Sequence, residues 1–414
     1  MTIPAIITCV IFVVVVILLI WQPVHPILIG AAIPALLAAF KIIDAKTAYA
    51  EFGNTTVVFF MGLVVVGEAF FKTGLADFIG GKIIGLIGKT EKGIILGTSI
   101  VGGGLSAFLN DTGTTACLMP IVGSMAEKAK IPKSKLLMAL AYSASLGGTI
   151  TLIGTTPHIV VNGMLADMGL RELRFFEYSK IGIPLLLVGM IYMSIFGTKL
   201  LPLKNIESKE DENRTSNKST SKMLIVALIF LSVVIAMATK VVPMHIAGVF
   251  GAILVVLTGC ISAQDAIKSF SLTTVFLVGG IFPLSRAMVK TGAAEYIVNL
   301  LSPALNGLPP ILLIAAISLL MLLVTQFLLN SSATVLMLPV SILVCQAAGI
   351  NPLAGAMAVS VCASGVFTTP FGTGPNLLVW EAGGYSMKDY LKCGFPLLIL
   401  FWIVTTILCY FIYL

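Results

Sequence analysis

The stretch Ser106-Ala107-Phe108-Leu109-Asn110-Asp111-Thr112-Gly113-Thr114-Thr115 decides how the rest of the chain is read. It sets an amide, a carboxylate and several hydroxyls between long apolar runs. A related stretch, Thr325-Gln326-Phe327-Leu328-Leu329-Asn330-Ser331-Ser332-Ala333-Thr334, follows about 220 residues later. Polar interruptions at corresponding places in two hydrophobic halves are typical of the binding site of a transporter.

Composition predicts an all-α polytopic membrane protein. Of the 414 residues, 58% are hydrophobic and 10% charged, and the mean hydropathy is +1.07, whereas a soluble domain has about 25% charged residues. The apolar runs are continuous and do not alternate as the strands of a β-barrel do. The uncharged run 3–20 lacks the basic start and the cleavage site of a signal peptide, so we interpret it as a retained first helix.

Several other classes of protein are disfavoured. The net charge of +7 is better explained by basic cytoplasmic loops than by nucleic-acid binding. The seven cysteines lie in or beside apolar runs and predict small core residues. The stretch Gly102-Gly103-Gly104 lacks the Lys and Ser/Thr of a phosphate-binding loop. We therefore expect no enzyme, no use of ATP and no organic cofactor.

The chain repeats itself on either side of a polar stretch. Four pairs of motifs recur at offsets of 218 to 220 residues: Pro23-Val24-His25 and Pro243-Met244-His245, Phe52-Gly53-Asn54-Thr55-Thr56-Val57 and Phe270-Ser271-Leu272-Thr273-Thr274-Val275, Lys72-Thr73-Gly74-Leu75-Ala76-Asp77 and Lys290-Thr291-Gly292-Ala293-Ala294-Glu295, Gly154-Thr155-Thr156-Pro157-His158 and Gly372-Thr373-Gly374-Pro375-Asn376. We therefore predict two membrane repeats, 1–203 and 223–414, joined by a cytoplasmic linker over 204–222.

Each repeat is predicted to hold about five transmembrane helices, a re-entrant hairpin and a broken helix. The hairpin tips are expected near 109–114 and 329–333, and the broken helices near 147–158 and 365–376, because Gly, Pro and hydroxyl residues interrupt helices there. The alternatives are full helices joined by a surface turn, and a packed proline kink. The number of crossings in a repeat is odd with or without re-entrance, so the second repeat is inverted relative to the first.

The distribution of Lys and Arg predicts the orientation. With the N-terminus outside and the linker in the cytoplasm, most basic residues lie inside, as the positive-inside rule requires. We predict a multi-pass protein of the cell's inner (plasma) membrane. On this topology the first hairpin opens to the cytoplasm and the second to the outside.

Few titratable residues interrupt the apolar segments. Asp111 is the one acidic residue in the two polar stretches and the two Gly- and Pro-rich segments; a charge at the bilayer centre costs at least ~2.5–3.5 kcal/mol unless it is paired or hydrated. It either lies beside a cation or caps the second helix of the hairpin. Glu68 and Lys72 predict an intrahelical ion pair. His158 corresponds to Asn376 and is expected to be a neutral hydrogen-bonding residue, with proton coupling as the alternative.

These motifs resemble the divalent anion:sodium symporter family, the INDY-type carriers of dicarboxylates and sulfate within the ion transporter superfamily. The resemblance covers nearly the whole chain. It rests on four motifs: Asn110-Asp111-Thr112-Gly113-Thr114-Thr115-Ala116 with Pro120, Gly154-Thr155-Thr156-Pro157-His158, Leu329-Asn330-Ser331 with Pro339, and Gly372-Thr373-Gly374-Pro375-Asn376.

The resemblance implies a homodimer in which hairpins and broken helices form a transport domain. This domain would carry the substrate past a fixed scaffold in an elevator-like motion. The implied ligands of two coupling sodium ions are Ser106, Asn110, Asp111 and Gly154 for the first, and Thr325, Leu328, Asn330 and Gly372 for the second. The implied ligands of a small anion between them are Asp111, Thr112, Thr155, Asn330, Ser331 and Thr373.

The sequence also departs from the family. It has Asn110-Asp111-Thr112 where the family has Ser-Asn-Thr, and it starts at the first repeat without a leading helix. A negative charge beside a divalent anion costs energy unless a cation screens it, which favours a cation role for Asp111. The leading hypothesis is sodium-coupled uptake of a dicarboxylate or sulfate. The alternatives are a cation/proton antiporter or a metalloid or anion exporter coupled through Asp111, and a channel-like or structural membrane protein.

Overall fold

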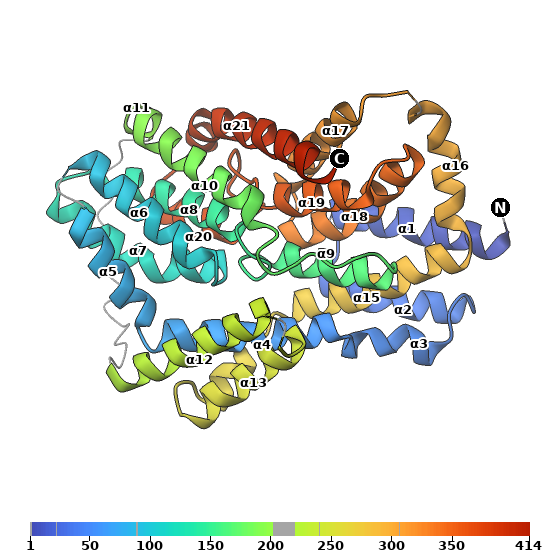
Figure 1. The fold of residues 1–414 in the computed structure, drawn as a ribbon, viewed down its shortest axis with the longest axis horizontal. Helices are drawn as coiled ribbons and strands as arrows, with labels where there is room; N and C mark the ends of the chain where they lie inside the picture. Colours follow the sequence, from blue (N-terminus) through green and yellow to red (C-terminus); the bar gives the residue numbers. More distant parts are fainter. Residues whose placement is uncertain (1, 22, 88–89, 202–219, 240, 306) are drawn as a thin grey trace.

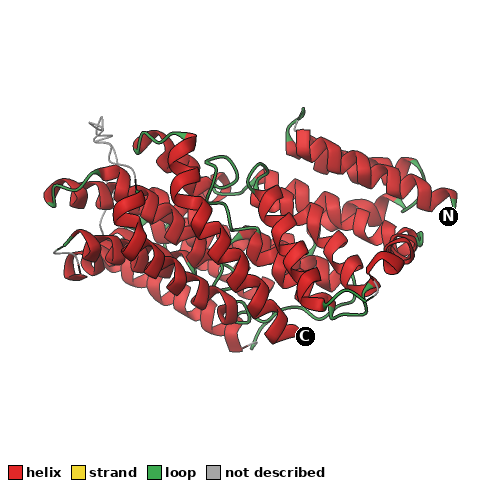
Figure 2. Cartoon of the chain, turned by 90° about the horizontal axis from the view of Figure 1, so that it is seen from above, coloured by secondary structure: helices red, strands yellow, loops and turns green. Residues whose placement is uncertain are grey.

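The computed structural model describes residues 2–21, 23–87, 90–201, 220–239, 241–305 and 307–414. Within these ranges every regular element is a helix, and Figure 2 shows only helices and loops. The predicted linker over 204–222 lies outside the described residues as far as residue 219, and helix α12 begins at Thr220.

Apolar helices of membrane length confirm the class of protein predicted from composition. Six helical segments are long and apolar enough to cross a bilayer: Ala45–Lys72, Ser179–Phe196, Thr220–Thr239, Leu272–Lys290, Asn330–Ala347 and Met387–Tyr413. Shorter apolar helices cover Ile3–Leu19, Pro26–Ala39, Met244–Leu257, Pro310–Thr325 and Pro352–Cys362.

The elements follow the same order on both sides of residues 202–219. The first side contains α1 (Ile3–Trp21), α2 (Pro26–Ala39), α3 (Ala45–Ala50), η1 (Glu51–Gly53), α4 (Thr55–Lys72), α5 (Leu75–Ile87), α6 (Glu91–Ser106), α7 (Asp111–Lys128), α8 (Lys133–Gly148), α9 (Thr156–Asp167), α10 (Ser179–Tyr192), η2 (Met193–Gly197) and α11 (Thr198–Leu200). The second side contains α12 (Thr220–Thr239), α13 (Met244–Leu257), α14 (Ala263–Lys268), α15 (Leu272–Lys290), α16 (Ala293–Leu305), α17 (Pro310–Thr325), α18 (Asn330–Ala347), α19 (Pro352–Cys362), α20 (Gly374–Ala382) and α21 (Met387–Tyr413).

The recurring motifs lie at equivalent helix ends. Asn54 caps α4 and Ser271 caps α15, since each side chain accepts a hydrogen bond from an amide of the first turn. At the other ends of these helices, Gly74 and Gly292 have φ angles of 78° and 76°. Only glycine adopts this conformation without strain, so both helices stop there.

The helices form two layers (Figure 1). The hairpin layer consists of α6–α10 and α17–α21, and the flanking layer consists of α1–α4 and α12–α15. The helices α5 and α16 run between the layers, at the left and the right of the view. Each layer therefore contains helices from both halves of the chain.

Glycine allows the two halves to interlock within the flanking layer. A Cβ atom on Gly280 of α15 would lie 2.0 Å from the carbonyl oxygen of Gly30 of α2. A Cβ atom on Gly62 of α4 would lie 2.6 Å from the backbone of Gly248 of α13. Backbones in contact through small residues are typical of helix pairs in membranes. Each half thus completes the flanking layer of the other.

The predicted ion pair between Glu68 and Lys72 is wrong. The Nζ atom of Lys72 lies 3.7 Å from Oδ1 of Asp265, on the short helix α14 of the other half. Lys72 is the last residue of α4, where α14 packs against that helix. A partner from another element therefore replaces the neighbour one turn away.

Candidate functional site

The first hairpin turns at residues 107–110, between α6 and α7. Asn110 caps α7, because its Oδ1 accepts hydrogen bonds from the amides of Thr112 at 2.9 Å and Gly113 at 3.3 Å. Asp111 is the first helical residue, so the capping role considered for Asp111 belongs to Asn110. The Oδ1 atom of Asp111 accepts a bond of 2.7 Å from the amide of Thr112.

Asp111 is a buried carboxylate, with 6% of the residue exposed. None of the described residues forms an ion pair with it. The start of α7 stabilises its negative charge through the helix dipole, by about 0.3–1 kcal/mol. That is less than the cost of a charge in the bilayer, so the geometry favours a bound cation or a proton at Asp111.

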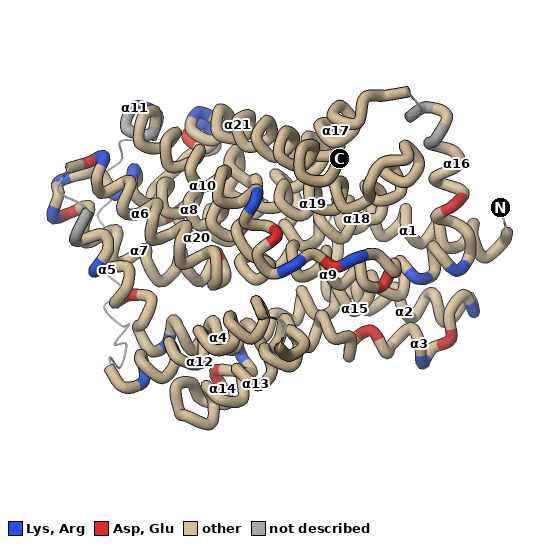
Figure 3. The backbone as a smooth tube through the Cα atoms, viewed as in Figure 1, with Lys and Arg blue, Asp and Glu red and all other residues tan. Residues whose placement is uncertain are grey.

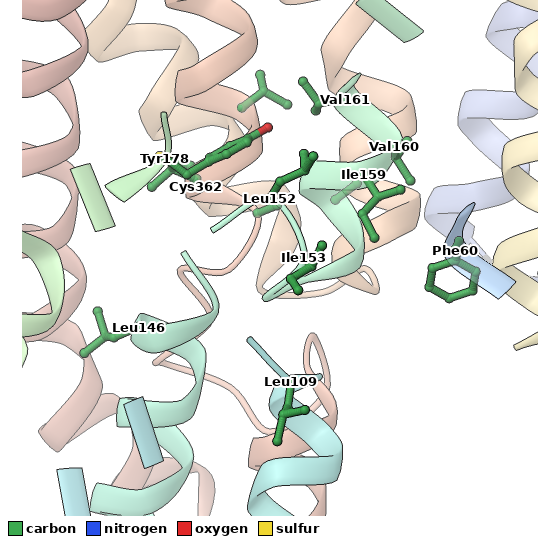
Figure 4. Packing of buried hydrophobic residues seen from close by; sticks show 14 of the residues in the cluster. Phe60, Leu109, Leu146, Leu152, Ile153, Ile159, Val160, Val161, Tyr178 and Cys362 are labelled. Carbon is green, nitrogen blue, oxygen red and sulfur yellow. The ribbon is translucent and has the colours of Figure 1, made fainter. Parts of the chain in front are cut away.

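The hairpin turn lies against the unwound segment 149–155, which separates α8 from α9. The hydroxyl of Thr151 donates to the carbonyl of Ala107. A Cβ atom on Gly154 would lie 2.9 Å from the carbonyl oxygen of Ser106, so only glycine fits there. Figure 4 shows Leu109, at the hairpin turn, below the loop that carries Leu152 and Ile153. Ser106 and Gly154, both expected at the first cation, are therefore neighbours.

The second hairpin turn lies against segment 363–373 in the same manner. The hydroxyl of Thr325 donates to the carbonyl of Ala363 at 2.8 Å. A Cβ atom on Gly372 would lie 2.1 Å from the carbonyl oxygen of Thr325. One terminal atom of the Asn330 amide lies 2.8 Å from Gly372 O, 3.0 Å from Ala363 O and 3.2 Å from Thr325 Oγ1. Three of the residues expected at the second cation thus meet.

The chemistry at Asn330 suits a cation. If the terminal atom among the three oxygens is the amide nitrogen, it donates hydrogen bonds to them. If it is the amide oxygen, four oxygens face one another, and a hard cation such as Na⁺ prefers this ligand set. Leu328, the fourth residue expected here, is buried in the turn before α18.

His158 and Asn376 have the same role in the two halves. Nδ1 of His158 lies 2.8 Å from the carbonyl oxygen of Thr151, and Nδ2 of Asn376 donates to the carbonyl of Thr369 at 2.9 Å. A carbonyl only accepts, so Nδ1 of His158 carries a proton. The His158 ring also stacks on Tyr178, with 3.8 Å between the ring centres. These contacts are those of the expected hydrogen-bonding histidine.

Two helices begin inside the protein without side-chain caps. Thr155 and Thr373 are the N-cap residues of α9 and α20, both extended and each 4% exposed, and neither side chain caps its helix. The first amides of a helix have no partner within the helix. Buried helix starts with free amides bind anions such as carboxylate or sulfate. Helix α18 also begins without a side-chain cap, at Leu329.

The helix starts of both halves converge. A Cβ atom on Gly374, the first residue of α20, would lie 2.1 Å from Oγ1 of Thr112 on α7. Asn330 at the start of α18 contacts Gly372 just before α20. Ser331 follows on the first turn of α18, where it is half-buried. The predicted anion-binding residues thus lie on helix starts that meet.

A cavity of about 370 Å³ opens beside the starts of α7 and α9, and the predicted anion-binding residues at the starts of α18 and α20 do not line it. Its volume is within the range of about 300–1,000 Å³ that is usual for small-molecule sites. It lies between the layers, and its polar lining residues are Asn110, Thr112, Thr155 and Thr156 of the hairpin layer and Glu68, Ser269, Ser271 and Thr274 of the flanking layer. The flanking residues were not predicted, although the recurring Thr-Thr motif before Val275 was a signal for them.

A polytopic helical protein with broken helices around a buried polar cavity belongs to the class of secondary transporters. The comparison with protein families agrees. The model of the family CitMHS, described as "Citrate transporter", matches residues 16–360 and 310–414. The chain therefore belongs to the CitMHS family, within the ion transporter superfamily, and it is not an enzyme.

Distant relatives and a solved structure support this assignment. The chain is 20% identical to an uncharacterized transporter, sll0640, of Synechocystis, over 99% of this chain and 97% of that protein. It is 24% and 25% identical to the sodium-dependent dicarboxylate transporter SdcS of Staphylococcus saprophyticus and of Staphylococcus aureus, over 91% of this chain and 80% of each SdcS. The crystal structure of the YdaH transporter of Alcanivorax borkumensis has the same fold, with a TM-score of 0.67, 13% identity and coverage of 93% of this chain and 98% of YdaH.

The equivalence of His158 and Asn376 generates a prediction. We expect His158→Asn to keep the melting temperature of the detergent-purified protein within a few degrees of the wild type, because an amide can donate to the carbonyl of Thr151 as Asn376 does to Thr369. His158→Leu removes the shorter of the two hydrogen bonds that this buried carbonyl accepts, the other being from the amide of Gly154, and costs about 0.5–1.5 kcal/mol. Equal melting temperatures for the two variants would show that this hydrogen bond is unimportant.

Proposed function

We propose that this protein is a sodium-coupled secondary carrier of a small divalent anion, a dicarboxylate in preference to sulfate. One observation carries the proposal: no Lys or Arg of the described residues lines the cavity beside the converging helix starts. A dianion in this site has amides and hydroxyls as partners but no balancing cation from the protein. Sodium ions bound at the hairpins supply the missing charge, which couples the two bindings. The similarity to SdcS, a sodium-dependent dicarboxylate transporter, and to a family described as citrate transporters supports a carboxylate.

The second cation site consists of Thr325, Asn330 and Gly372, with the backbone of Leu328. Without Na⁺, the nitrogen of the Asn330 amide faces the carbonyls of Ala363 and Gly372. With Na⁺, the amide turns its oxygen to the ion. The amide nitrogen then satisfies the buried carbonyls when no ion is bound, and the ion itself satisfies them when it is bound, which avoids the cost of leaving them unpaired.

The first cation site consists of Ser106, Asn110, Asp111 and Gly154. The hydroxyl oxygen of Ser106 is buried and has no hydrogen-bond partner among the described residues, so it is available as a ligand. Asp111 corresponds to Asn330 in the other half and adds a full negative charge. This charge strengthens cation binding and repels a dianion, so we assign Asp111 to the cation. Thr112, Thr155, Ser331 and Thr373 then hold the anion, with the amide of Asn330.

Contacts at the two ends of the molecule support inverted repeats. If the N-terminus is external, the two partners of each polar contact between distant segments given below are predicted to lie on the same side of the membrane. The external contacts are Lys290 with Ile42, Arg286 with Glu51 and Asp167, and Tyr413 with Glu177 and Asn351. The cytoplasmic contacts are Lys72 with Asp265, Lys222 with Gly259, Lys135 with Glu91, and Tyr385 with Ser134. The homodimer remains a prediction.

The layers suit an elevator-type cycle, in which the hairpin layer moves as one body along the flanking layer. The cavity beside the first hairpin includes Ser269 and Ser271, which precede α15 on the cytoplasmic side of this topology. We therefore assign the structure to an inward-open state. In the outward-open state, we expect the corresponding cavity to open beside the second hairpin, on the external side.

Uptake of labelled succinate into proteoliposomes tests the proposed function. We expect uptake by the wild type to require an inward Na⁺ gradient. Asn330→Ala removes a cation ligand and reduces uptake at limiting Na⁺ at least tenfold, since a lost charge-assisted contact costs about 1.5–3 kcal/mol. Asp111→Asn raises the Na⁺ concentration required for half-maximal uptake.

Lys46→Gln, at an exposed position of α3 that does not line the cavity, is the control and retains the wild-type response. Uptake that proceeds equally without Na⁺ contradicts the coupling. Proton flux that accompanies uptake and disappears in Asp111→Asn would favour the alternative of a proton-coupled carrier.

An ion-pair cluster joins the two layers on the predicted external side. Arg286 of α15 contacts Glu51 of the same layer, with 2.6 Å between Nη1 and Oε1. It also contacts Asp167 at the end of α9, in the hairpin layer, with 2.9 Å between Nη2 and Oδ1. The side chains of Glu51 and Asp167 are 4% and 7% exposed, and that of Arg286 is 41% exposed. Movement of the hairpin layer must break the contact with Asp167, so it stabilises the state described here.

Asp167→Asn is therefore expected to shift the population away from this inward-open state several-fold. A cysteine at Phe108, which lines the cavity, reports the state through its labelling from the cytoplasmic side by an impermeant maleimide. We expect slower labelling in Asp167→Asn. Asp265→Asn removes an ion pair within the flanking layer and leaves the labelling rate unchanged. Equal rates in both variants would mean that the contact between Arg286 and Asp167 does not hold the layers.

A further inference from the structure

The connection between α9 and α10, residues 168–178, folds back along α9 to the unwound segment 149–155. The carbonyl of Phe175 accepts a bond of 3.0 Å from the amide of Leu152. Asn162 of α9 makes two bonds to the backbone of Leu173, at 2.7 and 3.1 Å. The hydroxyl of Ser179 donates to the carbonyl of Ile150 at 2.8 Å. The connection is thus attached directly to the substrate-binding part of the hairpin layer.

Glu177 fixes the charged residues of this connection. Its carboxylate accepts two hydrogen bonds from the guanidinium of Arg171, at 2.8 and 2.9 Å. It also accepts the amide of Arg174 at 2.9 Å and the hydroxyl of Tyr413 at 3.0 Å. Burial raises the pKa of Glu177, but these bonds more than offset the burial and lower the pKa to about 2. The carboxylate is therefore ionised, and its oxygens are used within the connection.

The side chains of Arg174 and Lys180 remain without a carboxylate. Both are exposed, and neither forms an ion pair with any described residue. Together with Arg171, Phe175, Phe176 and Glu177, and with Ala238 of α12, they line a cavity of about 440 Å³. Three cations face one carboxylate there. The cavity therefore has an excess of positive charge and involves both layers.

The position of these charges is unusual for a membrane protein. On the topology proposed above, the connection is external, where Lys and Arg are disfavoured. Figure 3 shows basic and acidic segments along α9, between the layers. Unbalanced cations at that position are explained if they bind an anion.

We propose that this cavity is a second anion site, which holds a multivalent carboxylate on the external side before it enters the central site; this rests on the proposed function. Arg174 and Lys180 each bind one carboxylate group, and the aromatic walls of Phe175 and Phe176 exclude water from the hydrocarbon part. A cleft of one sign of charge raises the local concentration of the substrate and its rate of entry. Because the connection moves with the hairpin layer, Arg174 and Lys180 move together with the central site during the cycle, although Ala238 of α12 does not.

The same charges could attract the phosphate group of an anionic lipid, which shares the chemistry of a multivalent anion. The experiment therefore uses vesicles of neutral phosphatidylcholine and vesicles that also contain phosphatidylglycerol. The test protein is the full chain with Arg174→Gln and Lys180→Gln. Lys41→Gln with Lys46→Gln is the matched control, since it removes two exposed cations, one after α2 and one in α3, on the same predicted side.

Kinetics provide the first readout. In neutral vesicles at low ionic strength, we expect kcat/KM for succinate uptake by Arg174→Gln/Lys180→Gln to fall about five- to tenfold, with the maximal rate retained. The difference shrinks at high salt, because exposed charges are screened beyond about 3 Å at 1 M ionic strength. The control variant keeps the wild-type value. An unchanged kcat/KM in the test variant overturns the proposal.

Binding provides the second readout, independent of transport. We expect labelled citrate to bind the purified protein weakly in the absence of Na⁺, and this binding to be lost in Arg174→Gln/Lys180→Gln but retained in Asp111→Asn. If both variants retain citrate binding without Na⁺, the external site is overturned. If Arg174→Gln/Lys180→Gln loses this binding but neither the wild type nor any variant transports succinate, the result counts against the proposed function alone. A defect that depends only on phosphatidylglycerol would assign the cavity to lipid and overturn the substrate site.

Discussion

A helix that stops inside a bilayer leaves backbone groups without water, and every other feature of this structure depends on how those groups are satisfied. Most are paired within the protein. The hydroxyls of Thr151 and Thr369 donate to carbonyls of the two hairpin turns, and His158 and Asn376 donate to the carbonyls of those same threonines. The groups left over among the described residues include the carbonyl of Gly372 beside Asn330 and the amides at the starts of α9 and α20. In our account, the former is a ligand for a cation and the latter are ligands for an anion.

The duplication that we propose from the recurring motifs explains why the site has two similar sides and where they differ. Both halves use a hairpin turn against an unwound segment, and glycine at 154 and at 372 permits the contact. The halves differ where Asp111 corresponds to Asn330. A carboxylate in one half and an amide in the other make the two cation positions unequal in charge, so we expect them to differ in affinity. The absence of Lys and Arg from the described lining of the cavity then makes the anion depend on these cations.

Sequence reasoning located the helix interruptions because they depend on local chemistry. Gly148, Pro157 and Pro375 lie at helix ends that the structure also has, since glycine and proline limit helices wherever they occur. Contacts between distant segments could not be read in this manner. Nothing in the local pattern indicates that Lys72 meets Asp265, that Arg286 meets Asp167, or that Thr112 packs on Gly374. These pairs result from the packing of one half against the other.

Stability measurements on the purified protein test the central claim most directly, because a ligand that binds only the folded state raises the free energy of unfolding. At a concentration one hundred times its dissociation constant the increase is about 2.7 kcal/mol. If sodium supplies the charge that the dianion lacks, succinate or citrate raises the melting temperature in Na⁺ buffer and has little effect in K⁺ buffer of equal ionic strength. The same increase in both buffers would contradict the account.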